Sequence, residues 1–258
     1  MEIENLKKIT LNLLDTFLNA GELSLELRSK GLKKEIKLDN TPVTNGDIEV
    51  NNILTNKIKE ITPNIPIVSE ESSLNKKNFN LDKFWLIDPI DGTFDYINNR
   101  DEFTLNAGLI INKIPIVGII YAPAKKRLFY SYGAGFSFEM INNNEKKLIC
   151  EKTSNKNSIK ALSYSNELKP IIADWHEKIG VTEYIKMKSS IKFCVIATGE
   201  YDLYVAEPRA NEWDIAAGHA ILKNAGGIIT DFNGNEILYG KKNFQNPSLI
   251  LKRSANLK

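Results

Sequence analysis

The most informative residues of this sequence lie where an apolar run ends in two aspartates. Residues 85–87 are Trp, Leu and Ile, and Asp88 and Asp91 follow them, three residues apart. Pro89 fixes its own φ and Gly92 admits a close backbone approach, so we expect a tight turn in which the two carboxylates converge. The same residue types also form ordinary turns after strands, so spacing alone leaves a plain turn open.

The charge of the surrounding sequence favours a metal site at this turn. No Lys, Arg or His occurs from residue 84 to residue 99. Clustered carboxylates repel one another, and hard divalent cations such as Mg²⁺ are their usual counterions. If a helix begins after Gly92, its free N–H groups offer an anion site beside the metal. A metal next to such a site predicts phosphoryl chemistry.

Three further acidic residues stand at the expected ends of elements. Glu70 follows the apolar run 65–69, Asp47 stands three residues after Thr44, and Asp214 opens an expected helix. Each has an ordinary alternative. Glu70 could lie in a solvated turn, Thr44 and Asp47 could form a capping box, and Asp214 could cap its helix.

Hydrophobic periodicity predicts the elements that position these residues. Apolar residues recur at helical spacing from residue 3 to residue 20, and a second helix opens at Thr44 and ends before Pro63. The remaining expected helices span 168–179, 191–197 and 213–225. The expected strands are 65–69, 84–88, 104–111, 114–121, 127–132, 136–140, 159–163, 184–187, 202–206, 228–230 and 248–251.

The order of these elements predicts the fold class. Two helices, then antiparallel-looking strands, then alternating strands and helices indicate a layered α+β and α/β chain. The stretch 141–157 is rich in Asn, Lys and Glu and has little periodicity, so we interpret it as a seam. This divides the chain into an α+β half, 1–145, with most of the acidic residues, and an α/β half, 146–258, that supplies Asp214.

Composition excludes several classes of protein. The 258 residues include 34 Lys and Arg against 32 Asp and Glu, and this net charge of +2 argues against a nucleic acid polymer as partner. Two Cys and two His do not provide a disulfide framework, a zinc site or a Ser–His triad. An acidic N-terminus and the lack of a long apolar stretch predict a cytoplasmic protein without a transmembrane segment, with peripheral inner-membrane association left open.

Four segments together resemble the inositol monophosphatase superfamily of magnesium-dependent, lithium-sensitive phosphatases. They are TPVTNGD (41–47), SEES (69–72), WLIDPIDGT (85–93) and EWDIAAGHAILKNAGG (212–227), in matching order and spacing. The segments SSIKFC (189–194) and DLY (202–204) are similar in particular to the bacterial 3'(2'),5'-bisphosphate nucleotidase branch. The resemblance implies a layered αβαβα sandwich of the sugar-phosphatase type, with the site between the two halves.

The resemblance also implies a shared metal site that holds two to three Mg²⁺. Glu70, Asp88 and the carbonyl of Ile90 would bind one ion, and Asp88, Asp91 and Asp214 a second. Glu70 would also reach a weaker third ion through water. The implied catalytic residues are Asp47, Thr93 and Glu70, of which Thr93 and Asp47 orient and deprotonate the attacking water. The implied substrate-binding residues are Glu70, Ile90, Asp91, Gly92, Thr93 and Asp214, with the N–H groups of Gly92 and Thr93 holding phosphate oxygens.

The favoured substrate is a small phosphorylated molecule, adenosine 3',5'-bisphosphate, hydrolysed to AMP and phosphate by a monomer or homodimer. Its second phosphate needs a cation, for which Lys192, Arg209 or a nearby Lys is the candidate. Two segments depart from the relatives' pattern. Residues 163–166 read Ser-Tyr-Ser-Asn where relatives often have Ser-Arg-Ser-His, and Pro208 and Arg209 come three residues later than the relatives' Pro-Arg. Glu207 stands where inositol phosphatases place a hydroxyl-binding Glu, so an inositol-1-phosphatase or a broad sugar-phosphate phosphatase is the alternative.

Overall fold

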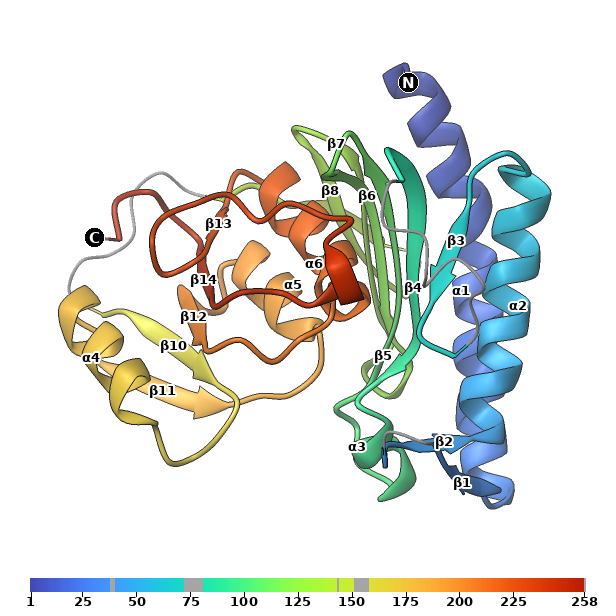
Figure 1. The fold of residues 1–258 in the computed structure, drawn as a ribbon, viewed down its shortest axis with the longest axis horizontal. Helices are drawn as coiled ribbons and strands as arrows, with labels where there is room; N and C mark the ends of the chain where they lie inside the picture. The colour runs from blue at the N-terminus through green and yellow to red at the C-terminus, as the bar shows by residue number, and fades with distance from the viewer. Residues whose placement is uncertain (38–39, 72–80, 143, 151–157, 258) are drawn as a thin grey trace.

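Helical layers alternate with two β-sheets across the molecule (Figure 1). The computed structural model describes residues 1–37, 40–71, 81–142, 144–150 and 158–257. Helices α1 (Ile3–Lys30) and α2 (Asn45–Ile61) cover the outer face of the first sheet. Helices α5 (Ile191–Ala197) and α6 (Glu212–Asn224) lie between the sheets, and α4 (Pro170–Ile179) covers the second sheet. This order of layers confirms the predicted αβαβα sandwich.

The first sheet has seven strands in the order β3-β4-β5-β6-β7-β8-β9. Only β3 and β4 pair in parallel; every other neighbour in the described sheet is antiparallel. The strands are β3 (Ile67–Ser69), β4 (Lys83–Asp91), β5 (Thr104–Ile111), β6 (Ile114–Ala122), β7 (Arg127–Gly133), β8 (Phe136–Ile141) and β9 (Asn144–Lys147).

The second sheet has five strands in the order β11-β10-β12-β14-β13. β10 (Lys160–Ser163), β11 (Glu183–Lys186) and β12 (Leu203–Ala206) are parallel, whereas β14 (Leu249–Lys252) runs antiparallel to β12 and β13 (Ile228–Thr230). Outside the two sheets lie the hairpin of β1 (Lys34–Ile36) and β2 (Pro42–Thr44), the short helix α3 (Thr93–Ile97), and two 3₁₀ turns at Pro123–Lys125 and Lys242–Phe244.

Strand β4 is buried on both faces, and its alternating side chains enter two different cores. Trp85 and Ile87 pack with α1 and α2, whereas Phe84 and Leu86 pack with α5 and α6. Successive side chains of a strand point to opposite faces, so a strand covered on both sides must be apolar throughout. The acidic residues that follow this apolar run therefore emerge at the end of a strand that is covered on both faces.

Two glycines of the first sheet let α6 approach it very closely. Gly108 of β5 and Gly118 of β6 are cross-strand partners. A Cβ at Gly118 would lie 2.2 Å from the carbonyl oxygen of Ala217, and one at Gly108 would lie 2.8 Å from the Cβ of Ala216. Real side chains do not reach such distances, so these positions require glycine while α6 keeps its place. The helix that carries Asp214 is thereby fixed directly on the sheet that carries Asp88.

The structure corrects the sequence predictions at three places. The first helix continues to Lys30, and the polar stretch after it forms the β1–β2 hairpin, which periodicity did not predict because all of β1 is exposed. Strand β9 lies within the seam 141–157, where we expected no regular element; its four exposed residues carry no apolar alternation. Residues 143 and 151–157 of that seam lie outside the described residues, and the division into 1–145 and 146–258 stays a prediction.

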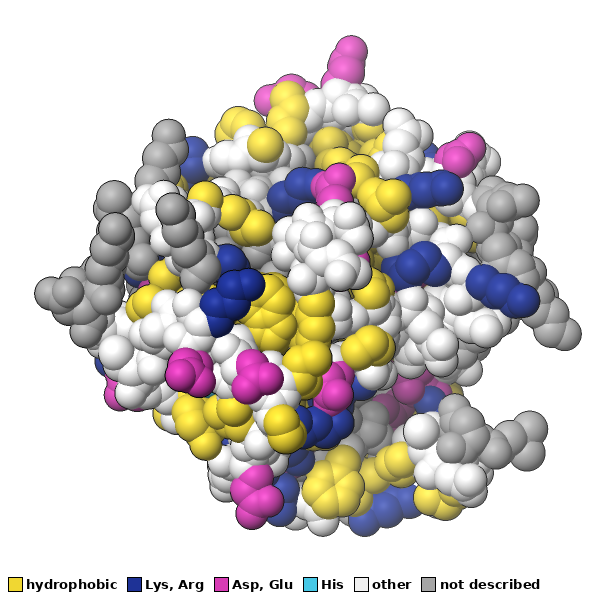
Figure 2. All heavy atoms as spheres, turned by 60° about the vertical axis from the view of Figure 1, so that its left-hand side comes forward, with side chains coloured by type: hydrophobic (Ala, Val, Ile, Leu, Met, Phe, Trp, Pro, Cys, Tyr) yellow, Lys and Arg dark blue, Asp and Glu magenta, His cyan; other side chains and the backbone are white. Residues whose placement is uncertain are grey.

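Basic and acidic side chains are interspersed with apolar ones on the face shown in Figure 2. This mixture fits the near balance of 34 basic and 32 acidic residues in the sequence. Within the described ranges, no helix combines the length and the apolar character needed to cross a bilayer.

Candidate active site

Asp88 and Asp91 lie on a bulged strand. Asp88 pairs with Asn106 of β5 and Asp91 with Thr104, so three steps along β4 match two steps along β5. One extra residue on one strand is a β-bulge, and Pro89, which has no N–H to give to the ladder, stands inside it. The tight turn predicted after Asp88 is therefore wrong: a bulge within β4 re-aims the side chains, and the strand continues to Asp91.

Gly92 then turns the chain into α3. Its φ is +95°, and a Cβ there would lie 2.7 Å from the carbonyl oxygen of Glu102. Only glycine accepts both conditions without strain. Helix α3 begins at Thr93, so the helix start anticipated after Gly92 is present. The first N–H groups of any helix have no partner within the helix, and here they lie beside the acidic residues.

Three carboxylates from distant parts of the sequence meet at this point. Oxygens of Glu70, Asp88 and Asp214 all lie within 4.8 Å of one another. Glu70 follows β3, Asp88 lies in β4, and Asp214 lies in the first turn of α6. We call these residues the acidic triple.

Asp88 is the innermost member of the acidic triple, only 1% exposed. Its Oδ1 has no hydrogen-bond partner within the described residues. Burial raises the pKa of Asp88, and the negative charges of Glu70 and Asp91 raise it further. A buried carboxylate oxygen without a donor, among other carboxylates, has the environment of a cation ligand.

Asp91 borders the acidic triple, and its negative charge raises the pKa of both Asp88 and Asp214. Within the described residues it does not belong to the group of oxygens closer than 4.8 Å. The backbone N–H of Ser190 donates to its carboxylate; burial raises the pKa of Asp91 to about 6, whereas the charge of Lys192 opposes that rise. Of the three residues implied for a second metal position, the structure thus brings Asp88 and Asp214 together and places Asp91 against α5.

Asp47 caps α2 and also contacts Thr93. Its Oδ2 accepts hydrogen bonds from the N–H of Thr44 at 2.8 Å and from the Thr44 hydroxyl at 2.5 Å, which completes a capping box at the start of α2. Its Oδ1 faces Thr93, whose Oγ1 lies 3.1 Å away. The same hydroxyl also lies 3.0 Å from the carbonyl oxygen of Ile90. Burial raises the pKa of Asp47.

Asp214 is likewise both a cap and a member of the acidic triple. Its Oδ2 accepts a hydrogen bond from the N–H of Asn211 at 2.8 Å, within a capping box at the start of α6. Burial raises its pKa well above the ordinary value, and repulsion by Asp91 and Glu70 adds to the effect. Because capping fixes the Asp214 side chain, the cap and a role as cation ligand are compatible.

Lys37 is a neighbour of the site that sequence reasoning missed. Its ammonium lies 3.1 Å from Glu70 Oε1 and 2.7 Å from Glu71 Oε1. Burial alone would lower the pKa of Lys37, but the two carboxylates outweigh it and raise the pKa to about 12. The hairpin that delivers Lys37 has no apolar pattern, so the sequence held no signal for this contact.

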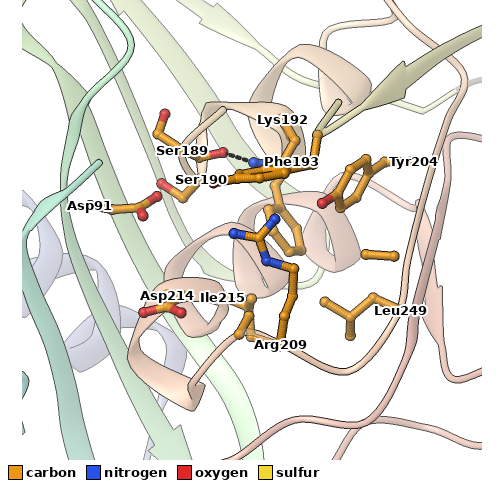
Figure 3. A pocket seen from close by; sticks show the side chains of 13 residues that line it. Asp91, Ser189, Ser190, Lys192, Phe193, Tyr204, Arg209, Asp214, Ile215 and Leu249 are labelled. Carbon is orange, nitrogen blue, oxygen red and sulfur yellow. Dashed lines mark hydrogen bonds between the residues drawn. The ribbon is translucent and has the colours of Figure 1, made fainter. Parts of the chain in front are cut away.

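A pocket of about 100 Å³ opens beside Asp91 and Asp214 (Figure 3). In this view the two aspartates lie on one side, Tyr204 and Leu249 on the other, and the guanidinium of Arg209 points up between them. Lys192 also lines the pocket, is 7% exposed, and donates a hydrogen bond to the carbonyl of Ser189. Burial lowers the pKa of Lys192 to about 8. The acidic centre therefore borders a pocket that contains two basic side chains.

A model of the inositol monophosphatase family matches residues 5–256 of this chain. The chain belongs to the inositol monophosphatase family. Similar proteins include the 3'(2'),5'-bisphosphate nucleotidase CysQ of Buchnera aphidicola subsp. Acyrthosiphon pisum, 35% identical over 86% of this chain and 83% of its own length. The protein of the same name from Escherichia coli (strain K12) is 31% identical over 89% of this chain and 93% of its own.

A crystal structure of CysQ from Bacteroides thetaiotaomicron, a bacterial member of the inositol monophosphatase family, has the same fold. It is 29% identical, covers 94% of this chain and 96% of its own, and superposes with a TM-score of 0.76. The resemblance identified from the sequence is thus confirmed. Members of this family depend on magnesium, and the acidic triple offers the oxygen ligands that this hard cation requires.

Proposed function

We propose that this protein is a 3'(2'),5'-bisphosphate nucleotidase that hydrolyses the 3'-phosphate of adenosine 3',5'-bisphosphate. Water supplies the oxygen that bonds to phosphorus, the bond from phosphorus to the ribose 3'-oxygen breaks, and AMP and phosphate leave. The observation that carries the proposal is the acidic triple beside a pocket with two basic side chains. The acidic triple suits the cations that a phosphatase needs, and the two basic side chains suit the second phosphate of the substrate.

Glu70, Asp88, Asp91, Asp214 and the carbonyl of Ile90 would hold two to three Mg²⁺. The unpartnered Oδ1 of Asp88 and the mutual repulsion of the carboxylates support this assignment. Bound magnesium supplies positive charge that lowers the pKa of water and offsets negative charge on the phosphoryl oxygens. The chain's own contribution is to keep several carboxylates together in a buried place where, without a cation, they repel one another.

Thr93 and Asp47 would prepare the water. The Thr93 hydroxyl can donate its proton to Asp47 Oδ1 and turn a lone pair toward a water molecule. The raised pKa of Asp47 makes its carboxylate a stronger base for the proton that the water loses. Glu70 would assist as a further catalytic and substrate-binding residue, and the N–H groups of Gly92 and Thr93 would bind phosphate oxygens at the start of α3.

Lys192 and Arg209 would recognise the 5'-phosphate. In the described residues, no carboxylate lies within ion-pair distance of either side chain. Both cations line the pocket together with Asp91, whose charge attracts Lys192 while that of Arg209 repels it, and a phosphate dianion would add attraction to both side chains. The names of the relatives at 31–35% identity support the same substrate class.

The alternative, an inositol-1-phosphatase, rested on Glu207 as a hydroxyl-binding residue. Glu207 forms an ion pair with Lys169, and both side chains are at least one-third exposed. It is absent from the residues that line the pocket at Asp91 and lines the outer cavity, which shares Tyr164 and Arg209 with that pocket. Because its carboxylate is paired with Lys169, the alternative gains no support from Glu207.

A panel of phosphate esters tests the proposal. Phosphate release should require Mg²⁺, and kcat/KM for adenosine 3',5'-bisphosphate should exceed that for inositol 1-phosphate by at least ~10²-fold, the yield of about one charged contact. Equal efficiencies, or a preference for inositol 1-phosphate, would shift the assignment to the alternative. Magnesium-independent release would remove the metal from the mechanism.

A further inference from the structure

Tyr164 and Arg209 form a stacked pair at the edge of the second sheet. The central carbon of the Arg209 guanidinium lies 3.4 Å from the centroid of the Tyr164 ring, which is face-to-face contact. Tyr164 directly follows β10, and Arg209 stands three residues after the end of β12. β10 and β12 are parallel, so both residues lie at the carboxyl end of the sheet, where open sheets of this type bind their ligands.

The stacked pair separates two cavities. The inner pocket, about 100 Å³, contains Asp91 and Asp214, and the outer one, about 330 Å³, extends past Glu207. Tyr164, Tyr204 and Arg209 line both. Ligand sites usually need 300 Å³ or more, so the inner pocket alone does not accommodate a nucleotide. A substrate whose reacting phosphate lies at the acidic triple must therefore extend past the guanidinium of Arg209.

The charge of Arg209 acts on the aspartates of the inner pocket. It lowers the pKa of both Asp91 and Asp214, although repulsion and burial prevail at each, so the guanidinium lies within electrostatic reach of the acidic centre. An arginine side chain at the surface has many rotamers, and Arg209 belongs to an irregular segment between β12 and α6. The Tyr164 ring restricts those rotamers because its centroid lies 3.4 Å from the central carbon of the guanidinium. Figure 3 shows the Arg209 guanidinium pointing into the pocket between Asp91 and Tyr204.

We propose that Tyr164 is a positioning residue for substrate choice: its ring holds the Arg209 guanidinium where that group binds the non-reacting 5'-phosphate. The inference rests on the proposed function and adds to it a residue that acts through another. Tyr164 and Arg209 occupy the two segments in which this sequence departs from its relatives, 163–166 and 205–209. A cation–aromatic stack in these segments gives this chain its own way of fixing a phosphate-binding arginine.

The test compares adenosine 3',5'-bisphosphate with adenosine 3'-phosphate, which lacks the second phosphate, at saturating Mg²⁺. Tyr164→Leu should raise KM for the bisphosphate about 3- to 30-fold, the range of a cation–aromatic contact, and leave kcat within about twofold. Arg209→Met should reduce kcat/KM for the bisphosphate by about 10- to 100-fold. Tyr164→Phe keeps the ring and should retain the wild-type preference for the bisphosphate. Adding Tyr164→Leu to Arg209→Met should produce no further loss.

Phe136→Leu is the matched control. Phe136 is 39% exposed against 42% for Tyr164, and the Lys147 ammonium lies 5.5 Å from its ring, but it belongs to β8 of the other sheet. Its variant should keep the wild-type preference. Thermal melting of each variant shows that the folded protein is being measured.

Each other outcome overturns a defined part of the proposal. If wild-type protein does not prefer the bisphosphate over adenosine 3'-phosphate, the proposed second-phosphate site fails. If wild type prefers it and Tyr164→Leu leaves KM unchanged, the role of Tyr164 fails while the function stands. If Tyr164→Leu weakens both substrates equally, or adds its full loss to Arg209→Met, the ring does not act through Arg209 and the inference is wrong.

Discussion

Replacing Asp88 by Asn should have opposite effects on stability and on activity. Two unit charges 4.8 Å apart, the separation that bounds the acidic triple, repel by roughly 3.5 kcal/mol at an effective dielectric constant of about 20. Asp88→Asn removes two of the three repulsions, roughly 7 kcal/mol for fully ionised carboxylates at that separation. Raised pKa values at Asp88 and Asp214 already relieve part of this repulsion by partial protonation, so we expect a gain of about 1–3 kcal/mol in metal-free protein.

Thermal unfolding with and without magnesium measures both effects. In EDTA, Asp88→Asn should melt about 2–10 °C above wild type, because each kcal/mol shifts the Tm of a chain of this size by about 2–4 °C. Saturating Mg²⁺ should stabilise wild type by about 3 kcal/mol at a hundredfold excess over its dissociation constant, and the variant by much less. Turnover of the variant should fall by several orders of magnitude, since a ligand charge is lost without a cavity.

Asp202→Asn is the matched comparison. Asp202 is also buried, but its Oδ1 lies 2.7 Å from Arg253 Nη2, so its neighbour is a cation. The same substitution there should lower the free energy of unfolding by about 1–3 kcal/mol, and the melting temperature with it. It should leave the response to magnesium intact. If Asp88→Asn also destabilises metal-free protein, or if it keeps the full stabilisation by magnesium, the acidic triple is not a repulsive cation site and the reasoning is refuted.

Three further outcomes are expected. Asp47→Asn keeps a capping oxygen but loses the proton acceptor of Thr93, so kcat should fall about 10²- to 10⁴-fold. The free energy of unfolding should stay within ~1 kcal/mol of wild type and the magnesium affinity close to it. Recovery of the lost rate by extra Mg²⁺ would contradict this. Gly92→Ala puts a Cβ 2.7 Å from the Glu102 carbonyl at φ +95°, so it should cost about 1–3 kcal/mol in denaturant unfolding and reduce turnover. Arg127→Met leaves Glu139 buried without its cation and should cost about 3 kcal/mol in the same assay, with unaltered activity per folded molecule.

Local patterns in the sequence predicted most of the elements because the sheets are covered by apolar faces. Buried faces occur on the helix opened by Thr44, on the strands from 104 to 140 and on the helix of Asp214. Hydrophobic periodicity in a sequence indicates such buried faces. The spacing of Thr44 and Asp47 predicted a capping box, and the position of Asp214 in the first turn of its helix predicted a cap. Capping and site chemistry were weighed as alternatives, yet each side chain uses one oxygen to cap and is held in the site by doing so.

What the sequence did not predict depends on backbone pairing and on exposed elements. The bulge at Asp88 and Asp91 arises from the register of β4 against β5, which no residue of β4 alone specifies. Hairpin β1–β2 has a fully exposed first strand, so its position over the site, and the contact of Lys37 with Glu70, had no apolar signal. Residues 84–99 contain no Lys, Arg or His. In the folded chain, however, Lys37 lies beside Glu70, so the carboxylates have a basic neighbour.

The close contact of α6 with the first sheet explains how carboxylates from two different layers can meet in the acidic triple. The acidic triple needs Asp214 within 4.8 Å of Asp88, although the two residues belong to different layers. Ordinary side chains on β5 and β6 would push the helix away by more than that tolerance allows. Gly108 and Gly118 remove this obstacle, and α6 presents to them the small side chains of Ala216 and Ala220 and the backbone of Ala217. The glycines and alanines are therefore as necessary to the acidic triple as its own members, because they set the distance between Asp88 and Asp214.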